Sequence, residues 1–294
     1  MVRSEDILAI KDLSLAARRT IDGFMSGINR SNMKGVGLEF SGYRSYQPGD
    51  DLRWLDWKLV ARTDRYYIRE SELETSISVR LLVDASRSMD HRDGAFTKMD
   101  YARHLAAALA WLAHSQGDAV GLYIFREGQV YATPARRDPQ HLARTFYQLE
   151  TMQAGGVFGD AISHRHIFLG EQKRELLIFI TDFYETSGEI GKLLELLAAL
   201  RHEIIVFHVM GGNEFSLDYG GYGQVEDLET GERVPVGAAV LTGDEYTARV
   251  NAWLGGVRMQ CLNRRIEYEL MRMDEPMDAA LRKYLKGRMG AGMV

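Results

Sequence analysis

The chain has 294 residues, of which 46% are hydrophobic and 26% are charged. These proportions are typical of a globular protein that can bury a sizeable core. A net charge of −5 does not favour nucleic acid as a partner. The single cysteine, Cys261, excludes an internal disulfide and fits a reducing compartment.

No apolar stretch reaches the ~18 residues that a membrane helix needs. The N-terminal sequence M-V-R-S-E-D-I-L is too acidic and too interrupted for a signal peptide. We therefore expect a cytoplasmic protein with no membrane span.

The N-terminal part combines a helix with an extended arm. Residues 4–22 carry apolar side chains at helical spacing, whereas residues 23–37 are rich in Gly, Ser and Asn and predict a loop. Residues 38–77 are dense in aromatic and charged residues, and the segment 65–70 predicts a strand. We therefore assign residues 1–75 to an N-terminal helix and arm, and residues 76–294 to the main domain.

From residue 78 onward, apolar strands alternate with helices. The pattern predicts strands at 78–83, 119–125, 129–133, 175–181, 203–210 and 265–271, and helices at 98–115, 139–152, 160–169, 188–200, 244–254 and 276–288. The segment 129–133 is expected to form a hairpin with the strand before it. A glycine-rich stretch at 211–223 and a hairpin at 225–236 form an insertion near 212–237. The pattern predicts an α/β fold with a doubly wound, mainly parallel sheet.

The motif D-A-S-R-S begins where the first buried strand ends. Asp84, Ser86 and Ser88 place one carboxylate and two hydroxyls at the carboxyl end of that strand. In an open parallel sheet, ligands bind in the crevice beyond these strand ends. Hard oxygen ligands suit Mg²⁺ or Mn²⁺. The motif therefore predicts metal-dependent adhesion rather than catalysis.

Together with a second strand end, this motif resembles the von Willebrand factor A domain. In that family D-x-S-x-S, a threonine from a later loop and an aspartate after the fourth strand hold a divalent metal. Here I-F-I-T-D ends in Asp182. The resemblance implies a metal-ion-dependent adhesion site of Asp84, Ser86, Ser88 and Asp182 on a Rossmann-type sheet. Val157 replaces the usual threonine, which weakens the expected metal binding, and Asp160 could reach the site through water.

A narrower resemblance lies upstream. Residues 37–57 read G-L-E-F-S-G-Y-R-S-Y-Q-P-G-D-D-L-R-W-L-D-W, and Ala61-Arg62 and Arg69-Glu70 follow. This order resembles the bacterial family called domain of unknown function 58. The resemblance implies an adaptor that works with a MoxR-type AAA+ ATPase in assembly, maturation or chaperone-like remodelling, on a client that the sequence does not identify. Many relatives carry N-terminal transmembrane helices, and this chain does not.

Other interpretations remain open. The D-x-S-x-S motif could be a helix cap in a metal-free interaction scaffold. A metal-dependent hydrolase would need a general acid or base beside Asp84, and the sequence names none. The chain has no G-x-S-x-G elbow and no P-loop, and its histidines lack zinc spacing. Within the arm, alternating Arg and Asp or Glu residues predict an internal ion-pair network, and Trp54 and Trp57 are expected to pack. The sequence thus predicts a protein-binding module, not an enzyme.

Overall fold

The computed structural model describes residues 4–30, 43–45, 62, 65–69, 77–160, 165, 167–168, 175–185, 187–200, 202–215, 224–235, 243–277 and 281–284. Contacts divide the chain into two units, one made of residues 1–27 and 77–294 and the other of residues 28–76. This division differs from the predicted boundary at residue 75, because the N-terminal helices belong with the main unit.

The main unit is built on a mainly parallel sheet. In the described part of the chain this sheet has six strands, in the order β12-β9-β8-β3-β6-β7. Their bounds are Ser78–Asp84 (β3), Ala119–Arg126 (β6), Gln129–Arg136 (β7), Leu176–Thr181 (β8), Glu203–Met210 (β9) and Glu267–Arg272 (β12). Neighbouring strands run parallel, except that β7 is antiparallel to β6. The predicted α/β fold is therefore confirmed.

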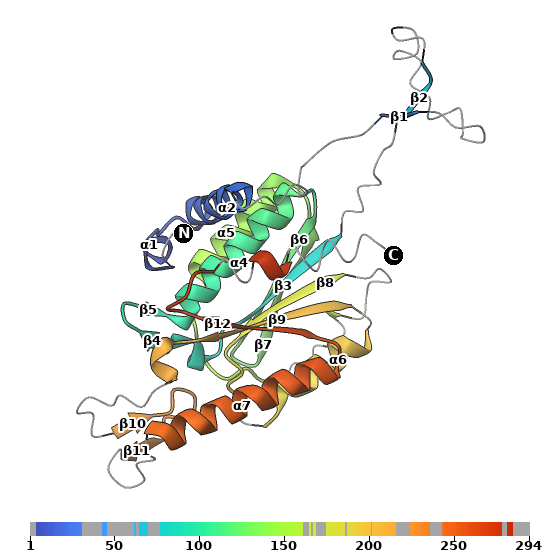
Figure 1. The fold of residues 1–294 in the computed structure, drawn as a ribbon. Coiled ribbons are helices and arrows are strands. Elements are labelled where there is room, and N and C mark those ends of the chain that lie inside the picture. Colours follow the sequence, from blue (N-terminus) through green and yellow to red (C-terminus); the bar gives the residue numbers. More distant parts are fainter. Residues whose placement is uncertain are drawn as a thin grey trace. The chain divides into compact units, whose positions relative to one another are not determined.

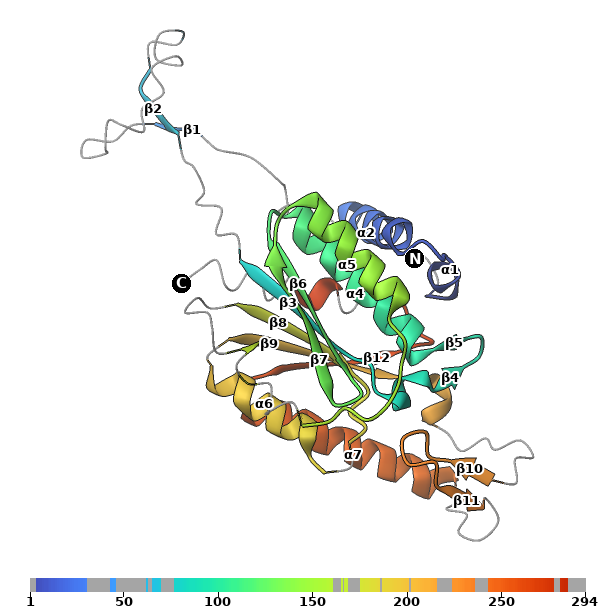
Figure 2. The same cartoon turned by 180° about the vertical axis from the view of Figure 1, so that it is seen from behind.

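Helices cover both faces of this sheet (Figures 1 and 2). One face carries α1 (Ser4–Leu8), α2 (Leu13–Arg30), α4 (Lys98–Ser115) and α5 (Pro139–Thr151), and the other carries α6 (Glu189–Ala199) and α7 (Gly243–Asn263). Because helices cover both faces, the central strands are buried on both sides, which is why they read as continuous apolar runs. Every residue of β8, with the sequence L-L-I-F-I-T, is buried.

The N-terminal helices are tied to the main unit by specific contacts. The imidazole of His104 on α4 lies 3.2 Å from the carbonyl oxygen of Ile10, and the backbone N–H of Leu13 donates to the Glu150 carboxylate at 3.1 Å. The Arg18 guanidinium lies 4.4 Å from the centroid of the Trp111 ring. These contacts bury the apolar side of α2 and explain why residues 1–27 group with the sheet.

The second unit contains a small antiparallel ladder. β1 (Tyr43–Ser45) pairs with β2 (Tyr67–Arg69), which confirms the strand expected at 65–70. Most of the arm motif, including Trp54, Trp57 and the predicted ion-pair network, lies outside the described residues.

Several elements differ from their predicted lengths. Helix α7 continues to Asn263 instead of ending near residue 254, because Gly255 and Gly256 weaken a helix without stopping it. A short ladder of β4 (Arg92–Asp93) and β5 (Phe96–Thr97) was not expected. The insertion forms the predicted hairpin, with β10 (Gln224–Glu226) antiparallel to β11 (Arg233–Pro235). The helices expected at 160–169 and 276–288 fall largely outside the described residues.

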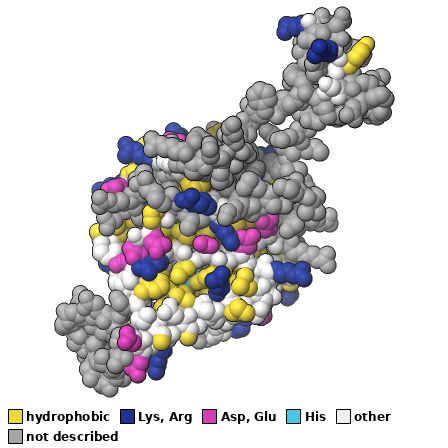
Figure 3. All heavy atoms as spheres, viewed as in Figure 1, with side chains coloured by type: hydrophobic (Ala, Val, Ile, Leu, Met, Phe, Trp, Pro, Cys, Tyr) yellow, Lys and Arg dark blue, Asp and Glu magenta, His cyan; other side chains and the backbone are white. Residues whose placement is uncertain are grey.

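The surface of α7 carries exposed apolar side chains, among them Trp253, Met259 and Leu262. Figure 3 shows hydrophobic side chains gathered between charged ones on the face where β12 and α7 lie. Even so, no helix in the described ranges has both the length and the apolar character needed to cross a bilayer.

A buried ion pair joins the starts of two central strands. The Nε atom of Arg80 on β3 lies 2.8 Å from an Oε2 atom of Glu175, which precedes β8. The two side chains are 4% and 0% exposed. We predict that Glu175→Leu lowers the free energy of unfolding by about 3–5 kcal/mol, because it removes the carboxylate that lies against a buried guanidinium. Urea denaturation of Glu175→Leu and of Arg80→Met/Glu175→Leu tests this, since the double variant should regain much of the loss. A double variant as unstable as the single one would contradict the prediction.

Glycine in the middle of α7 offers a second test. A Cβ atom at Gly255 would meet no neighbour within 4 Å, so alanine fits there without a clash. We predict that Gly255→Ala raises the free energy of unfolding by about 0.5–1 kcal/mol. The control is Gly188→Ala, which also has open space but a φ of +75°, and it should destabilise the protein. Thermal unfolding of both variants checks the contrast, and equal shifts would contradict it.

Candidate metal-binding site

The predicted site lies where the chain order of the sheet reverses. Counted from the β7 edge, the strands follow the order third, second, first, fourth, fifth and sixth. The reversal falls between β3 and β8, and in doubly wound sheets the ligand crevice opens at this point. The β4–β5 ladder and the β10–β11 hairpin lie at the same end of the sheet (Figures 1 and 2).

All four predicted metal ligands converge there. The hydroxyl oxygens of Ser86 and Ser88 lie 3.0 Å apart, and the Ser88 hydroxyl donates to Oδ1 of Asp182 at 3.1 Å. The backbone N–H of Ser86 donates to Oδ1 of Asp84 at 2.9 Å. The four residues are between 0% and 7% exposed. The structure thus brings together two carboxylates and two hydroxyls from strand ends almost a hundred residues apart.

Thr181 fixes the orientation of Asp84. Its hydroxyl donates to Oδ2 of Asp84 at 2.7 Å and accepts from the backbone N–H of Phe183 at 3.1 Å. Phe183 has a φ of 56°, which is uncommon for a residue with a side chain and typical of functional turns. This turn also lets the N–H of Tyr184 donate to Oδ1 of Asp182 at 3.1 Å. Thr181 was not among the predicted site residues, although it directly precedes Asp182.

A buried ammonium lies beside the acidic pair. Nζ of Lys98 lies 3.0 Å from Oδ2 of Asp182 and 2.8 Å from Oε1 of Glu214. Burial alone would lower the pKa of Lys98, but Asp182 and Glu214 together raise it above its ordinary value. The capping box between Thr97 and Asp100 starts α4 at Lys98 and so fixes this position. Lys98 was not among the predicted site residues, although the helix predicted at 98–115 already placed it at a helix start.

The site remains rich in negative charge despite Lys98. Burial, and then the charge of Asp182, raise the pKa of Asp84 to about 7. A further carboxylate, that of Glu229, comes close enough to Ser86 and Ser88 for their hydroxyls to affect its pKa. Its buried Oε1 atom has no hydrogen-bond partner among the described residues. An additional cation would therefore be electrostatically favoured here.

The donor set fits a divalent metal. Carboxylate and hydroxyl oxygens are ligands that Mg²⁺ and Mn²⁺ prefer. Within the described ranges, no three His, Cys, Asp or Glu side chains form a group that could hold a metal, so such a site depends on the serine hydroxyls. Lys98 already pairs with Oδ2 of Asp182. The atoms left to bind a metal are the serine hydroxyls, the Asp84 carboxylate and Oδ1 of Asp182.

The loop that carries Val157 lies against the motif. The N–H of Arg87 donates to the carbonyl of Gly156 at 2.8 Å, and the N–H of Gly155 donates to the carbonyl of Ala85 at 2.9 Å. Gly156 has a φ of +66°, and a Cβ there would lie 2.8 Å from the Cα of Glu127, so only glycine fits. The Val157 side chain is 46% exposed, and Asp160 is exposed too. The loop thus reaches the site through its backbone.

The described histidines make structural contacts. Burial lowers the pKa of His208 to about 3, and its Nδ1 atom lies 2.8 Å from the hydroxyl of Tyr268. The Nδ1 atom of His202 accepts from the N–H of Glu175 at 3.3 Å. His164 and His166 lie outside the described residues.

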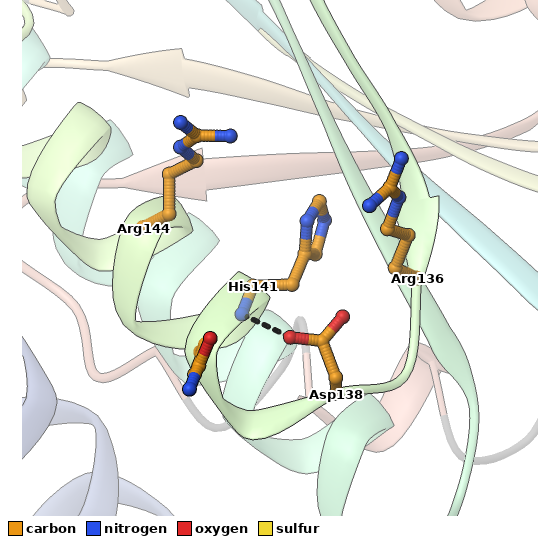
Figure 4. A pocket seen from close by; sticks show the side chains of 5 residues that line it. Arg136, Asp138, His141 and Arg144 are labelled. Carbon is orange, nitrogen blue, oxygen red and sulfur yellow. Dashed lines mark hydrogen bonds between the residues drawn. The ribbon is translucent and has the colours of Figure 1, made fainter.

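A larger cavity lies between the end of the edge strand β7 and the start of α5. Its volume is about 350 Å³, and Figure 4 shows Arg136, Asp138, His141 and Arg144 around it. Asp138 caps α5 by accepting from the N–H of His141 at 2.8 Å, and the His141 ring contacts the carbonyl of Val120 at 2.9 Å. Because Asp138 and His141 make contacts within the fold and the cavity lies beside the edge strand β7, it is distinct from the predicted metal site at the strand reversal.

The strand order and the two oxygen-bearing strand ends define a doubly wound α/β protein of the von Willebrand A type. Residues 42–252 match the model of the family described as "Protein of unknown function DUF58", and the chain belongs to that family. Uncharacterized proteins of Mycobacterium tuberculosis (Rv1480) and Mycobacterium bovis (Mb1516) are each 31% identical to it over 227 residues, which cover 76% of this chain and 71% of each relative.

Solved structures show more distant likeness. BatB from Bacteroides thetaiotaomicron is 17% identical, with 74% of this chain and 98% of BatB covered and a TM-score of 0.49. The SpRpn10 VWA domain is 10% identical, with 71% of this chain and 95% of that domain covered and a TM-score of 0.39. Because these scores are low, the assignment to the fold rests on the strand order and the site.

Loss of Lys98 tests the electrostatic description. We predict that Lys98→Met lowers the free energy of unfolding by about 3–5 kcal/mol in EDTA, because Asp182 loses its buried counter-charge. Millimolar Mg²⁺ should restore part of the loss. Lys192→Met on the exposed side of α6 is the matched control. Denaturant titrations with and without Mg²⁺ check the prediction, and a Lys98 variant as stable as the control would contradict it.

Proposed function

We propose that the chain is a protein-binding adaptor and that its partner binds at the carboxyl ends of the parallel strands. The observation that carries this proposal is the buried convergence of Asp84, Ser86, Ser88 and Asp182 at the strand reversal. A cavity of about 170 Å³ opens beside Ser88 and Asp182, so a partner side chain has a place to enter. Membership in a family with a von Willebrand A-type fold supports an interaction role.

Each residue has a defined part in this proposal. A divalent cation held by Asp84, Ser86, Ser88 and Asp182 would supply a Lewis-acidic position for a partner's Glu or Asp carboxylate. Thr181 orients Asp84 through its 2.7 Å hydrogen bond. Lys98 supplies the counter-charge of Asp182 through a 3.0 Å ion pair. Ser86 and Ser88 lie in a buried turn and direct their hydroxyls toward the same site.

We propose further that the partner is a MoxR-type AAA+ ATPase and that the pair acts in the assembly or maturation of a client in the cytoplasm. The support is the resemblance in residues 37–57 and the match to the DUF58 family. Because the chain has no P-loop, the energy for remodelling has to come from a partner.

A metal-free scaffold is the second candidate function. The observation in its favour is the buried ammonium of Lys98, which already neutralises one carboxylate of the pair. In this alternative the partner contacts the same strand ends through hydrogen bonds, with no metal between them. Metal titration separates the two candidates.

Calorimetric titration with Mg²⁺ provides this test. We expect the wild-type chain to bind the metal and Asp84→Ala to bind none while keeping its circular dichroism spectrum. Asp244→Ala, an exposed carboxylate on α7, is the control and should bind as the wild type does. No heat of binding for the wild type would favour the metal-free scaffold, and unchanged binding by Asp84→Ala would place any metal elsewhere.

A further inference from the structure

The cavity of about 350 Å³ between the end of β7 and the start of α5 is separate from the predicted metal ligands. All the residues that line it are polar: Arg136, Asp138, Gln140, His141 and Arg144. None of them takes part in the proposed function. The volume falls within the range of small-molecule sites, and a lining of polar and charged side chains favours a charged ligand over an apolar one.

Two arginines line this cavity from different elements. Arg136 is the last residue of β7, and Arg144 lies in the second turn of α5. Figure 4 shows their side chains on either side of the His141 ring. In the part of the chain that the structure describes, neither guanidinium forms an ion pair or a side-chain hydrogen bond. In a chain with a net charge of −5, two such guanidinium groups in one cavity indicate a site for an anion.

Hydrogen bonds of Asp138 and His141 hold the cavity wall in place. The Asp138 carboxylate accepts from the backbone N–H of His141 at 2.8 Å, so it acts as the N-cap of α5 and not as a partner of the arginines. Nε2 of His141, a residue only 8% exposed, lies 2.9 Å from the carbonyl oxygen of Val120 and must donate to it. Among the residues that the structure places, none supplies an acceptor for the backbone N–H of Gln140. The first turn of α5 thus retains one N–H donor for a ligand.

We propose that this cavity binds a small molecule through its phosphate group. A phosphate group carries about −1.5 to −2 charges at neutral pH and has three acceptor oxygens, so it can neutralise both guanidinium groups and also accept from the N–H of Gln140. A carboxylate has one charge and two oxygens, and it would leave one arginine without a counter-charge. The planar fork of arginine suits paired hydrogen bonds to phosphate oxygens. A volume of about 350 Å³ exceeds that of a phosphate group alone, so the part of the molecule that carries the phosphate also has room.

Phosphorus-31 NMR titrations of the intact chain test the proposal. The probes are inorganic phosphate, glycerol 3-phosphate and a phosphoserine peptide, each at constant ionic strength. Arg136→Gln and Arg144→Gln remove the two cavity charges one at a time. Arg137→Gln is the matched control, because it removes the same charge from an adjacent exposed position that does not line the cavity. We expect each cavity variant to bind glycerol 3-phosphate about tenfold or more weakly than the wild type does, and the control to bind it equally well.

Both cavity arginines are exposed, so their replacement should leave the fold intact, which circular dichroism checks. Saturable binding of glycerol 3-phosphate that is weakened in the two cavity variants alone would support the proposal. Equal binding by all the chains, or an equal loss in all three variants, would overturn it, because the site would lie elsewhere or depend on net charge alone.

No saturable binding of glycerol 3-phosphate by the wild type would overturn the proposal as well. Binding of inorganic phosphate alone would then reduce the cavity to a site for the free ion, and binding of the peptide alone would assign it to a phosphorylated protein. Asp84→Ala should bind glycerol 3-phosphate as the wild type does, which keeps this test independent of the predicted metal site.

Discussion

Two carboxylates, Asp84 and Asp182, end neighbouring strands at the centre of the sheet and are both almost completely buried. The parallel register that sets Val83 opposite Ile180 makes their proximity unavoidable. Burial raises the pKa of Asp84, and the repulsion between the two like charges raises it further. The surrounding residues can therefore be understood as compensation for one electrostatic constraint.

The compensation comes from several parts of the chain. Helix α4 contributes the Lys98 ammonium, β8 contributes the Thr181 hydroxyl, and the turn after β3 contributes two serine hydroxyls. Together they supply one positive charge and several hydrogen-bond donors to the two carboxylates. A site of this kind is suited to a divalent cation. This suitability for a cation is the reason to propose that these strand ends, which have no evident catalytic groups, bind a partner.

The sequence predicted the parts of the site that depend on local pattern. Apolar runs located β3 and β8, and the polar residues directly after them identified Asp84, Ser86, Ser88 and Asp182. The doubly wound sheet followed from the alternation of strands and helices, because that alternation leaves few topologies.

The remaining features depend on long-range packing and carry no local signal. Lys98 resembles an ordinary charged residue at a helix start until the fold places it beside Asp182. Asp227 lies in a polar hairpin turn typical of solvent-exposed loops, and the fold brings it to the hydroxyl of Tyr184, two residues after Asp182. The packing of α2 on α4 likewise depends on contacts such as that of Arg18 with Trp111, whose partners lie far apart in the chain.

The central claim is that metal at this sheet edge captures a partner protein. The most direct measurement is co-elution of the chain with the MoxR-type AAA+ ATPase encoded nearest to it, in Mg²⁺ and in EDTA, for the wild type and for Asp84→Ala. We expect a complex that forms with Mg²⁺ and is lost in EDTA and in the variant. A complex that survives both changes would contradict the metal mechanism, and the absence of a complex under every condition would contradict the proposed partner.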